Sequence, residues 1–322
     1  MDLTKINIQP ADPERDFEAI AALLTTQETE PSTSESLLEW YNKQPADGIH
    51  FSVALSPQRE LQGFNGIYRS YTNLKRNYSI YVIVEQESRR HGLGSRLHDH
   101  LLAQAAELDA LTLRTRVRDN FEQGLHFATQ RGFIIKKHSI EMMFDLKSWD
   151  GSRYEPTLQS LQTQGFRFTN MTELGDTQEA RRKLYTLNNN AAATDPGSDG
   201  IPPWATFEEF ERDVCKSSWY HPETQIVAID TSTGEWAAMS AITVFEGSEH
   251  AYNLFTGTDM RYRGRKLAQA VKSLALRKAL TFGVDTVRTS HNSENVAMIA
   301  IDTKLGYVCT PGTFIMVKEL GG

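Results

Sequence analysis

The sequence repeats itself at a constant spacing of 174 residues, and this repeat strongly limits the folds that the chain can adopt. The matches run without a gap across more than fifty residues of each half: Tyr78 with Tyr252, Arg89 with Arg263, Leu93 with Leu267, Thr112 with Thr286, and Gly132 with Gly306. Chance identities would scatter over many spacings. Since 322 residues also suffice for about two domains, the sequence predicts two copies of one domain.

Each copy carries the same order of local signals. In the first copy, Tyr78–Val84 has the β-branched and aromatic residues of a buried strand, and a glycine-containing stretch follows at 89–94. Leucine and alanine then recur at helical spacing over 97–108, which predicts a helix with one apolar face. A second strand at Leu111–Val117, a second helix at Phe121–Gln130 and a strand opening at Gly132 complete the order β-loop-α-β-α-β.

The predicted domains are residues 1–146 and 166–322. The stretch 147–165 is polar, contains one proline and has no sustained periodicity, so it is predicted to be a linker. The segment 188–203 is rich in asparagine, glycine and proline and is predicted to be a long surface loop, either a binding element or a solvated connector. Segments 59–69 and 232–245 are predicted to be hairpins.

Composition narrows the class of protein. A net charge of -7 disfavours general binding to nucleic acid or to anionic lipid. The chain has no run of ~18 apolar residues and no apolar stretch at its start, so we expect a cytoplasmic protein without a membrane span. Cys215 and Cys309 are the only cysteines, which excludes a disulfide framework; each is expected to be a small buried hydrophobe. His98 and His100 do not share a helix face, so no metal site is expected.

The stretch RRHGLG at 89–94 has the features of an anion site. A glycine turn between a strand and a helix places several backbone N–H groups at the positive end of the helix dipole. Gly92 and Gly94 permit close approach to the backbone, while Arg89 and Arg90 supply positive charge. Simple turn glycines are the alternative interpretation, because such a loop is a weak signal alone.

The order strand, Arg-x-x-Gly-x-Gly, helix, strand and helix ending in Gly-Phe resembles the GNAT superfamily of acyl-CoA N-acyltransferases. The first copy matches the motif of that family at Arg89, Gly92 and Gly94. The second copy, RGRKLA, matches at Arg263 and Ala268 but has Lys266 at the central glycine. The resemblance covers nearly the whole chain, and the tandem layout is similar to that of mycothiol synthase and related double-domain members. It implies an α+β fold of two domains, each with a mixed, mostly antiparallel sheet flanked by helices.

The resemblance also implies a cofactor, coenzyme A or acetyl-CoA, whose pyrophosphate the loop amides hold. Carried onto this chain, the cofactor-binding residues are Ile83, Val84, Arg89, Arg90, His91, Gly92, Leu93, Gly94 and Asn120 in the first copy, and Thr256, Thr258, Arg263, Gly264, Arg265, Lys266, Leu267, Ala268, Asn292 and Asn295 in the second. For Asn292 and Asn295, contact with the pantetheine amides and simple helix capping are both open.

The chemistry implied is direct attack of an amine on the thioester, with a backbone N–H near Ile83-Val84 or Gly257-Thr258 as the oxyanion donor. The tyrosine that serves as acid in many members is replaced by Ala128 in the first copy and by Asp302 in the second. The candidate catalytic residues are Asp302, Tyr252 and Glu246. The resemblance to double-domain members implies that the second copy carries the chemistry, and that the first retains a cofactor or is structural.

The resulting prediction is an acyl-CoA-dependent N-acyltransferase, with acetyl as the default group, that acts on the primary amine of a small molecule as a monomer or homodimer. One alternative is a module that binds coenzyme A as a sensor or structural ligand without turnover, because both copies lack the tyrosine. Another is acylation of a protein or of an amine linked to tRNA, with the basic, aromatic stretch 69–78, including Lys75 and Arg76, as the acceptor site.

Overall fold

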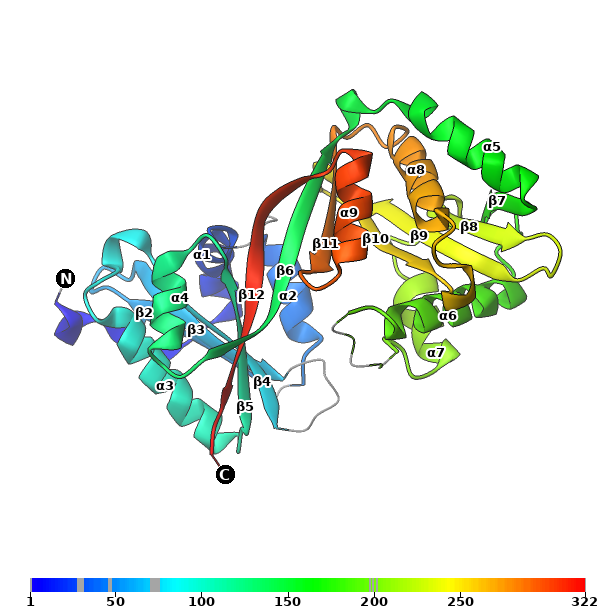
Figure 1. Cartoon of the computed structure of the whole chain (residues 1–322). Helices are drawn as coiled ribbons and strands as arrows, with labels where there is room; N and C mark the ends of the chain where they lie inside the picture. Colours follow the sequence, from blue (N-terminus) through cyan, green and yellow to red (C-terminus); the bar gives the residue numbers. More distant parts are fainter. Residues whose placement is uncertain are drawn as a thin grey trace. The chain divides into compact units, whose positions relative to one another are not determined.

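The repeat is present in the structure, element by element. The computed structural model describes residues 2–27, 32–45, 48–69, 76–196, 198, 200 and 202–321. They fall into two units, Met1–His138 with Thr313–Gly322, and Ser139–Gly312 (Figure 1). β5 and β11 match residue for residue at the spacing of 174, and so do β6 and β12.

The elements that begin in unit 1 are β1 (Asn7–Pro10), α1 (Pro13–Thr25), α2 (Ser34–Asn42), β2 (Ile49–Leu55), β3 (Leu61–Arg69), β4 (Asn77–Val84), α3 (Leu93–Glu107), β5 (Thr112–Arg118), α4 (Glu122–Thr129) and β6 (Ile134–Asp145). Those that begin in unit 2 are α5 (Glu155–Thr163), β7 (Phe166–Asn170), α6 (Gln178–Ala193), α7 (Phe207–Phe210), β8 (Gln225–Asp230), β9 (Trp236–Val244), β10 (His250–Thr258), α8 (Leu267–Ala279), β11 (Thr286–Asn292), α9 (Val296–Leu305) and β12 (Val308–Glu319).

Each unit is completed by the last strand of the other copy. The strand order is β1-β2-β3-β4-β5-β12 in unit 1 and β6-β11-β10-β9-β8-β7 in unit 2. The two exchanged strands pair in the same register, since Glu319 lies opposite Thr112 and Asp145 lies opposite Thr286. In both sheets one parallel pair, β4 with β5 or β10 with β11, interrupts an antiparallel order. This arrangement confirms the predicted fold class.

Helices cover both faces of each sheet (Figure 1). In unit 1, Phe17 and Ile20 of α1 pack on one face against Phe64 and Ile83, whereas Leu101 of α3 is buried in the core of the other face. In unit 2, α8 lies in one core and α6 in the other. No helix in the described part of the chain is both long and apolar enough to cross a membrane.

Several local predictions need correction. The stretch 147–165 contains α5, whose Leu158 and Leu161 are buried in the core of unit 2, and the two units divide the chain differently from the predicted ranges. Segments 59–69 and 232–245 each form a turn and one strand. The other strand of the first hairpin is β2 and that of the second is β8, and both lie upstream of the predicted segments. Residues 188–193 belong to α6, so the predicted loop is shorter. Cys215 is buried as expected, but Cys309 is exposed.

Candidate active site

A cavity of about 620 Å³ opens in unit 1 where β4 and β5 separate. The two strands pair at Asn77 with Thr112, Tyr78 with Leu113 and Ser79 with Arg114, and the described pairing ends there. The residues that follow on both strands, Ile80–Val84 and Thr115–Arg118, line the cavity. The cavity therefore forms where the two strands no longer pair with each other.

The cavity is lined from both faces of the sheet. Val82 and Val84 pack on the α3 side, whereas Ile83 packs on the α1 side with Phe17 and Ile20. All three β4 residues line the cavity, together with the loop before α3 and with Leu24 and Gln27 at the end of α1. A ligand that enters at the loop can thus reach through the sheet to the α1 face.

The loop at 89–94 leads into the N-terminus of α3, as the sequence predicted. Arg89 Nε donates to the carbonyl oxygen of Val84 at 3.0 Å, which ties the loop to the end of β4. Gly92 is the N-cap of α3, with φ of +88°, and no side chain caps this helix. The first amides of α3 are therefore available to an anion, and the helix dipole favours one there.

The loop of the second copy has the same backbone conformation despite Lys266. Two positions are left-handed in each copy: Arg90 and Gly92 in the first, Gly264 and Lys266 in the second. The first copy thus has its glycine at the second left-handed position, Gly92, and the second copy has its glycine at the first, Gly264. The sequence comparison treated Lys266 as the loss of the central glycine, whereas the structure shows that the turn is kept with a strained lysine.

We expect the Gly92→Ala variant to have a free energy of unfolding lower by about 1 kcal/mol, because it places a Cβ at positive φ. The Lys266→Gly variant should gain up to about 1 kcal/mol, since relief of strain exceeds the entropy that glycine adds to the unfolded chain. Urea unfolding followed by circular dichroism measures both. His91→Gly, at an exposed loop position outside the left-handed set, is the control and should lose stability. A loss of stability in Lys266→Gly would contradict the left-handed turn.

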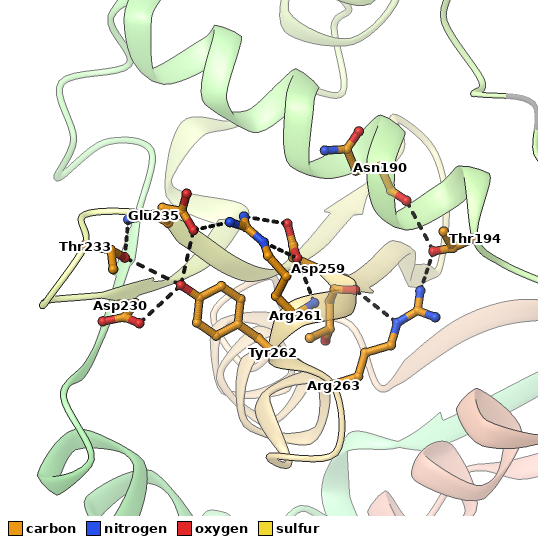
Figure 2. Close-up of polar contacts among 10 residues, drawn as sticks. Asn190, Thr194, Asp230, Thr233, Glu235, Asp259, Arg261, Tyr262 and Arg263 are labelled. Atoms are coloured by element: carbon orange, nitrogen blue, oxygen red, sulfur yellow. Dashed lines mark hydrogen bonds and ion pairs between the residues drawn. The ribbon is translucent and has the colours of Figure 1, made fainter.

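Side chains on both sides hold the loop of the second copy (Figure 2). Arg263 donates to the carbonyl oxygen of Thr258 at 3.4 Å, repeating the contact of Arg89, and also to the hydroxyl of Thr194 at the end of α6. Arg261 pairs with Asp259 and Glu235, and the Tyr262 hydroxyl donates to Asp230 at 3.1 Å. Arg263 therefore has a structural role in this loop.

A buried histidine faces the cavity of unit 1. His98 on α3 lines the cavity although its side chain is only 4% exposed. Its Nε2 has no hydrogen-bond partner among the described residues. Burial, together with the charges of Arg131 and Lys318, lowers the pKa of His98, which favours the neutral ring. A neutral imidazole with an unpartnered nitrogen is able to hydrogen-bond a polar ligand in the cavity.

Unit 2 has a buried cluster of charged residues at the equivalent positions. At the spacing of 174, His98 and Ala128 correspond to Lys272 and Asp302, and Val117 and Phe133 correspond to His291 and Tyr307. Lys272 and Asp302 are fully buried and form an ion pair.

Other members of this cluster complete its contacts. His291 Nε2 lies 2.6 Å from the second carboxylate oxygen of Asp302, and the ammonium of Lys272 lies 5.0 Å from the centroid of the Tyr307 ring. Burial lowers the pKa of Lys272, which Asp302 opposes, and burial raises the pKa of Tyr307. Asp302 is therefore part of the interior of unit 2, where the sequence offered a catalytic acid or a surface carboxylate.

Several other residues predicted for the second copy also have internal contacts. Thr256 Oγ1 donates to Asn253 at 3.0 Å, inside the core. Asn295 accepts a hydrogen bond from Met298 as the N-cap of α9, so the structure shows the capping alternative for Asn295. Asn292 accepts one from the amide of Glu294, in the turn before the helix. Tyr252 packs on Phe245, and Glu246 is exposed in the turn after β9.

The first copy brings most of its predicted residues to the cavity. Ile83, Val84, Arg89, Arg90, Gly92 and Gly94 line it. Asn120 lines a second cavity of about 510 Å³, which shares Arg89 and Arg90 with the first. Leu93 is buried in the core, so only its amide can face a ligand, and His91 is exposed.

Four basic residues of the cavity were not predicted as site residues: His98, Arg116, Arg118 and Arg131. Arg131 lies over the ring of Phe127 at 3.5 Å and donates to Ser95 Oγ at the start of α3, at 2.6 Å. The signal for Arg116 and Arg118 was present in the strand predicted at 111–117, where arginine alternates with other residues over 114–118. Only the divergence of β4 and β5 makes that side of the strand part of a cavity.

Comparisons with known proteins agree with this geometry. Residues 17–133 match the model of the acetyltransferase (GNAT) family. A GCN5-related N-acetyltransferase from Sphaerobacter thermophilus has a similar structure, with a TM-score of 0.74 at 17% identity, over 98% of this chain and 96% of that one. A tandem GNAT protein from the clavulanic acid biosynthesis pathway gives a TM-score of 0.71 at 17% identity, over 98% and 99% of the two chains. No curated protein matches the sequence.

Proposed function

We propose that the chain is an N-acetyltransferase that binds acetyl-CoA in unit 1, because residues 17–133 match the model of the GNAT acetyltransferase family and the whole chain is similar in fold to a tandem GNAT protein. The acceptor in this proposal is the primary amine of a small molecule. The observation that carries it is the cavity that starts at the uncapped amides of α3 and reaches through the sheet to the α1 face.

The residues of unit 1 fit acetyl-CoA. The uncapped amides of the first turn of α3, with Arg90 beside them, would hold the diphosphate. The apolar side chains of β4 and the unpartnered Nε2 of His98 would face the rest of the cofactor inside the cavity. Arg89 contributes by fixing the loop to Val84.

When bound, acetyl-CoA supplies an acetyl thioester: the amine nitrogen forms a bond to the acetyl carbon, the C–S bond breaks, and one proton passes from the nitrogen to the thiolate or to solvent. The chain offers a backbone donor for the carbonyl oxygen. Glu85 N donates to Gln62 of β3 at 2.9 Å, and backbone groups alternate between the two edges of a strand. The N–H groups of Val82 and Val84 therefore face the side of β4 where β5 has diverged, and Val84 is our candidate oxyanion donor.

We place the chemistry in unit 1, whereas the sequence favoured the second copy. The positions that line the cavity in unit 1 carry the buried Lys272–Asp302 pair in unit 2. Both oxygens of the Asp302 carboxylate are engaged inside unit 2, one with Lys272 and the other with His291.

Release of free thiol from acetyl-CoA in the presence of a panel of small amines tests the proposal, with isothermal titration of acetyl-CoA as the binding assay. We expect a heat of binding at one site per chain and thiol release that depends on an amine. Cys309 is exposed, so a blank without acetyl-CoA corrects for its reaction with the thiol reagent. Binding without thiol release for any amine would instead support the sensor alternative, which the alanine at position 128 favours.

The alternative acceptor site at 69–78 lies mostly outside the described residues, since Ser70–Lys75 are not described. Of the two basic residues named for it, Arg76 is ion-paired with Asp109.

A further inference from the structure

We propose that the acceptor of this enzyme carries an anionic group, a carboxylate or a phosphate, and that Arg116 and Arg118 of β5 bind that group. The inference rests on the proposed function, because it concerns the acceptor end of the same cavity. It assigns a substrate class that neither the family match nor the fold determines.

The register of the strands places these arginines on the α1 face of the sheet. Ser79 lies opposite Arg114 in the parallel pair of β4 and β5. Successive side chains of a strand alternate between its faces, so Arg116 and Arg118 share a face with Ser79 and hence with Ile83. Ile83 packs against α1. The arginines thus line the cavity from the side opposite the loop and α3.

The cavity is positive throughout. No residue that lines the cavity is an aspartate or a glutamate, and five are arginines: Arg89, Arg90, Arg116, Arg118 and Arg131. This composition is unusual for a chain with a net charge of -7. Among the described residues no ion pair includes Arg116, whose side chain is exposed, whereas Arg118 has contacts of its own. An anionic ligand in the cavity would meet a lining that contains arginines and no carboxylate.

The arginines lie close to one another. Two residues apart on one strand face, the backbone positions of Arg116 and Arg118 are ~7 Å apart, so a single anionic group can be reached by both side chains. Arg114 lies on the same face, and burial together with the charge of Arg116 lowers the pKa of Arg114.

The pairing of this strand does not depend on these arginines. The equivalent strand β11 has Ser290 and Asn292 in their places and forms the same pairs. On β12, the residues opposite Arg116 and Arg118 are Ile315 and Thr313, and Arg118 Nη1 lies 3.5 Å from the Thr313 hydroxyl. The diphosphate of the cofactor does not account for them either, because the loop that would hold it lies on the α3 face. Recognition of the acceptor is the remaining role.

The test compares amines that differ only in an acidic group: glycine with glycinamide, β-alanine with its amide, and O-phosphoethanolamine with ethanolamine. The selectivity is the ratio of kcat/KM for the anionic member to that for the neutral one, measured by thiol release. Since a charge-assisted hydrogen bond contributes about 1.5–3 kcal/mol, we expect a ratio of about 10 or more for at least one pair.

Arg116→Gln and Arg118→Gln should each lower this ratio about tenfold or more while the dissociation constant of acetyl-CoA in calorimetry stays unchanged. Arg116→Lys keeps the charge and should retain part of the selectivity. Arg59→Gln, which removes an exposed arginine from the turn before β3, is the matched control and should leave the ratio as in the wild type.

The outcomes separate this inference from the proposed function. Thiol release with equal rates for both members of every pair, or a ratio unaffected in Arg116→Gln and Arg118→Gln, would overturn the inference and leave the acetyltransferase in place. Absence of both acetyl-CoA binding and thiol release would overturn the proposed function. A loss of acetyl-CoA affinity in Arg116→Gln or Arg118→Gln would place those arginines at the cofactor and also reject the inference.

Discussion

Gly94→Val raises the dissociation constant for acetyl-CoA about 100-fold or more in the expected result, whereas Ala268→Val at the equivalent position of unit 2 leaves it unchanged. Gly94 is in the first turn of α3 and lines the cavity, and a Cβ there would meet the ring of Phe127 at 3.0 Å. A branched side chain would occupy the space in front of the helix amides. Two charge-assisted hydrogen bonds of about 1.5 kcal/mol or more each amount to at least about 100-fold in affinity.

Isothermal titration with acetyl-CoA measures both variants, and circular dichroism confirms that each is folded. The paired design tests which unit binds the cofactor, because the two positions correspond in the repeat. If Ala268→Val lost affinity and Gly94→Val kept it, the assignment of the cofactor to unit 1 would be wrong.

Asp302→Ala should lower the free energy of unfolding of unit 2 by about 3–5 kcal/mol, because it leaves the ammonium of Lys272 buried without its partner. Lys272→Met should lower the free energy of unfolding by a similar amount, because it leaves the carboxylate of Asp302 buried without its partner. The double variant Lys272→Met/Asp302→Ala should be more stable than the sum of the two single effects predicts, since it leaves neither charge of the pair behind.

Urea unfolding followed by tryptophan fluorescence suits this measurement, because Trp149, Trp204, Trp219 and Trp236 lie in unit 2 and only Trp40 in unit 1. Thiol release under conditions where the variant is folded completes the test. A stable Asp302→Ala protein with lost activity would restore Asp302 to the role of acid that the sequence offered.

Much of the fold could be predicted from local patterns. The strand predicted at Tyr78–Val84 is β4, the helix predicted at Phe121–Gln130 is α4, and Gly132 has the positive φ expected of a residue just past a helix end. These features depend on side-chain periodicity and on the steric freedom of glycine, which are properties of short segments. The two predicted hairpins were wrong because each segment contains only one strand, β3 or β9, and the strand on the other side of its turn, β2 or β8, lies upstream of the segment.

The candidate site was predicted only in part. The loop residues of the first copy were identified from their motif, but the second copy was favoured because it had the richer set of polar side chains. Three of those side chains are engaged with neighbours in the fold: Thr256 with Asn253, Asn295 with the start of α9, and Asp302 with Lys272. Composition cannot distinguish a polar group that faces a ligand from one that satisfies a buried neighbour.

The sequence by itself determined the repeat, the order of elements in each copy and the turn that presents helix amides to an anion, because each depends on residues close together in the chain. The tertiary structure decided which strands complete each sheet, since β6 and β12 are interchangeable in pattern and only long-range pairing assigns them. It also decided where the cavity lies. A cavity depends on which side chains from separate elements fill the space between two diverging strands, and here a histidine and an alanine in one copy are replaced by a buried ion pair in the other.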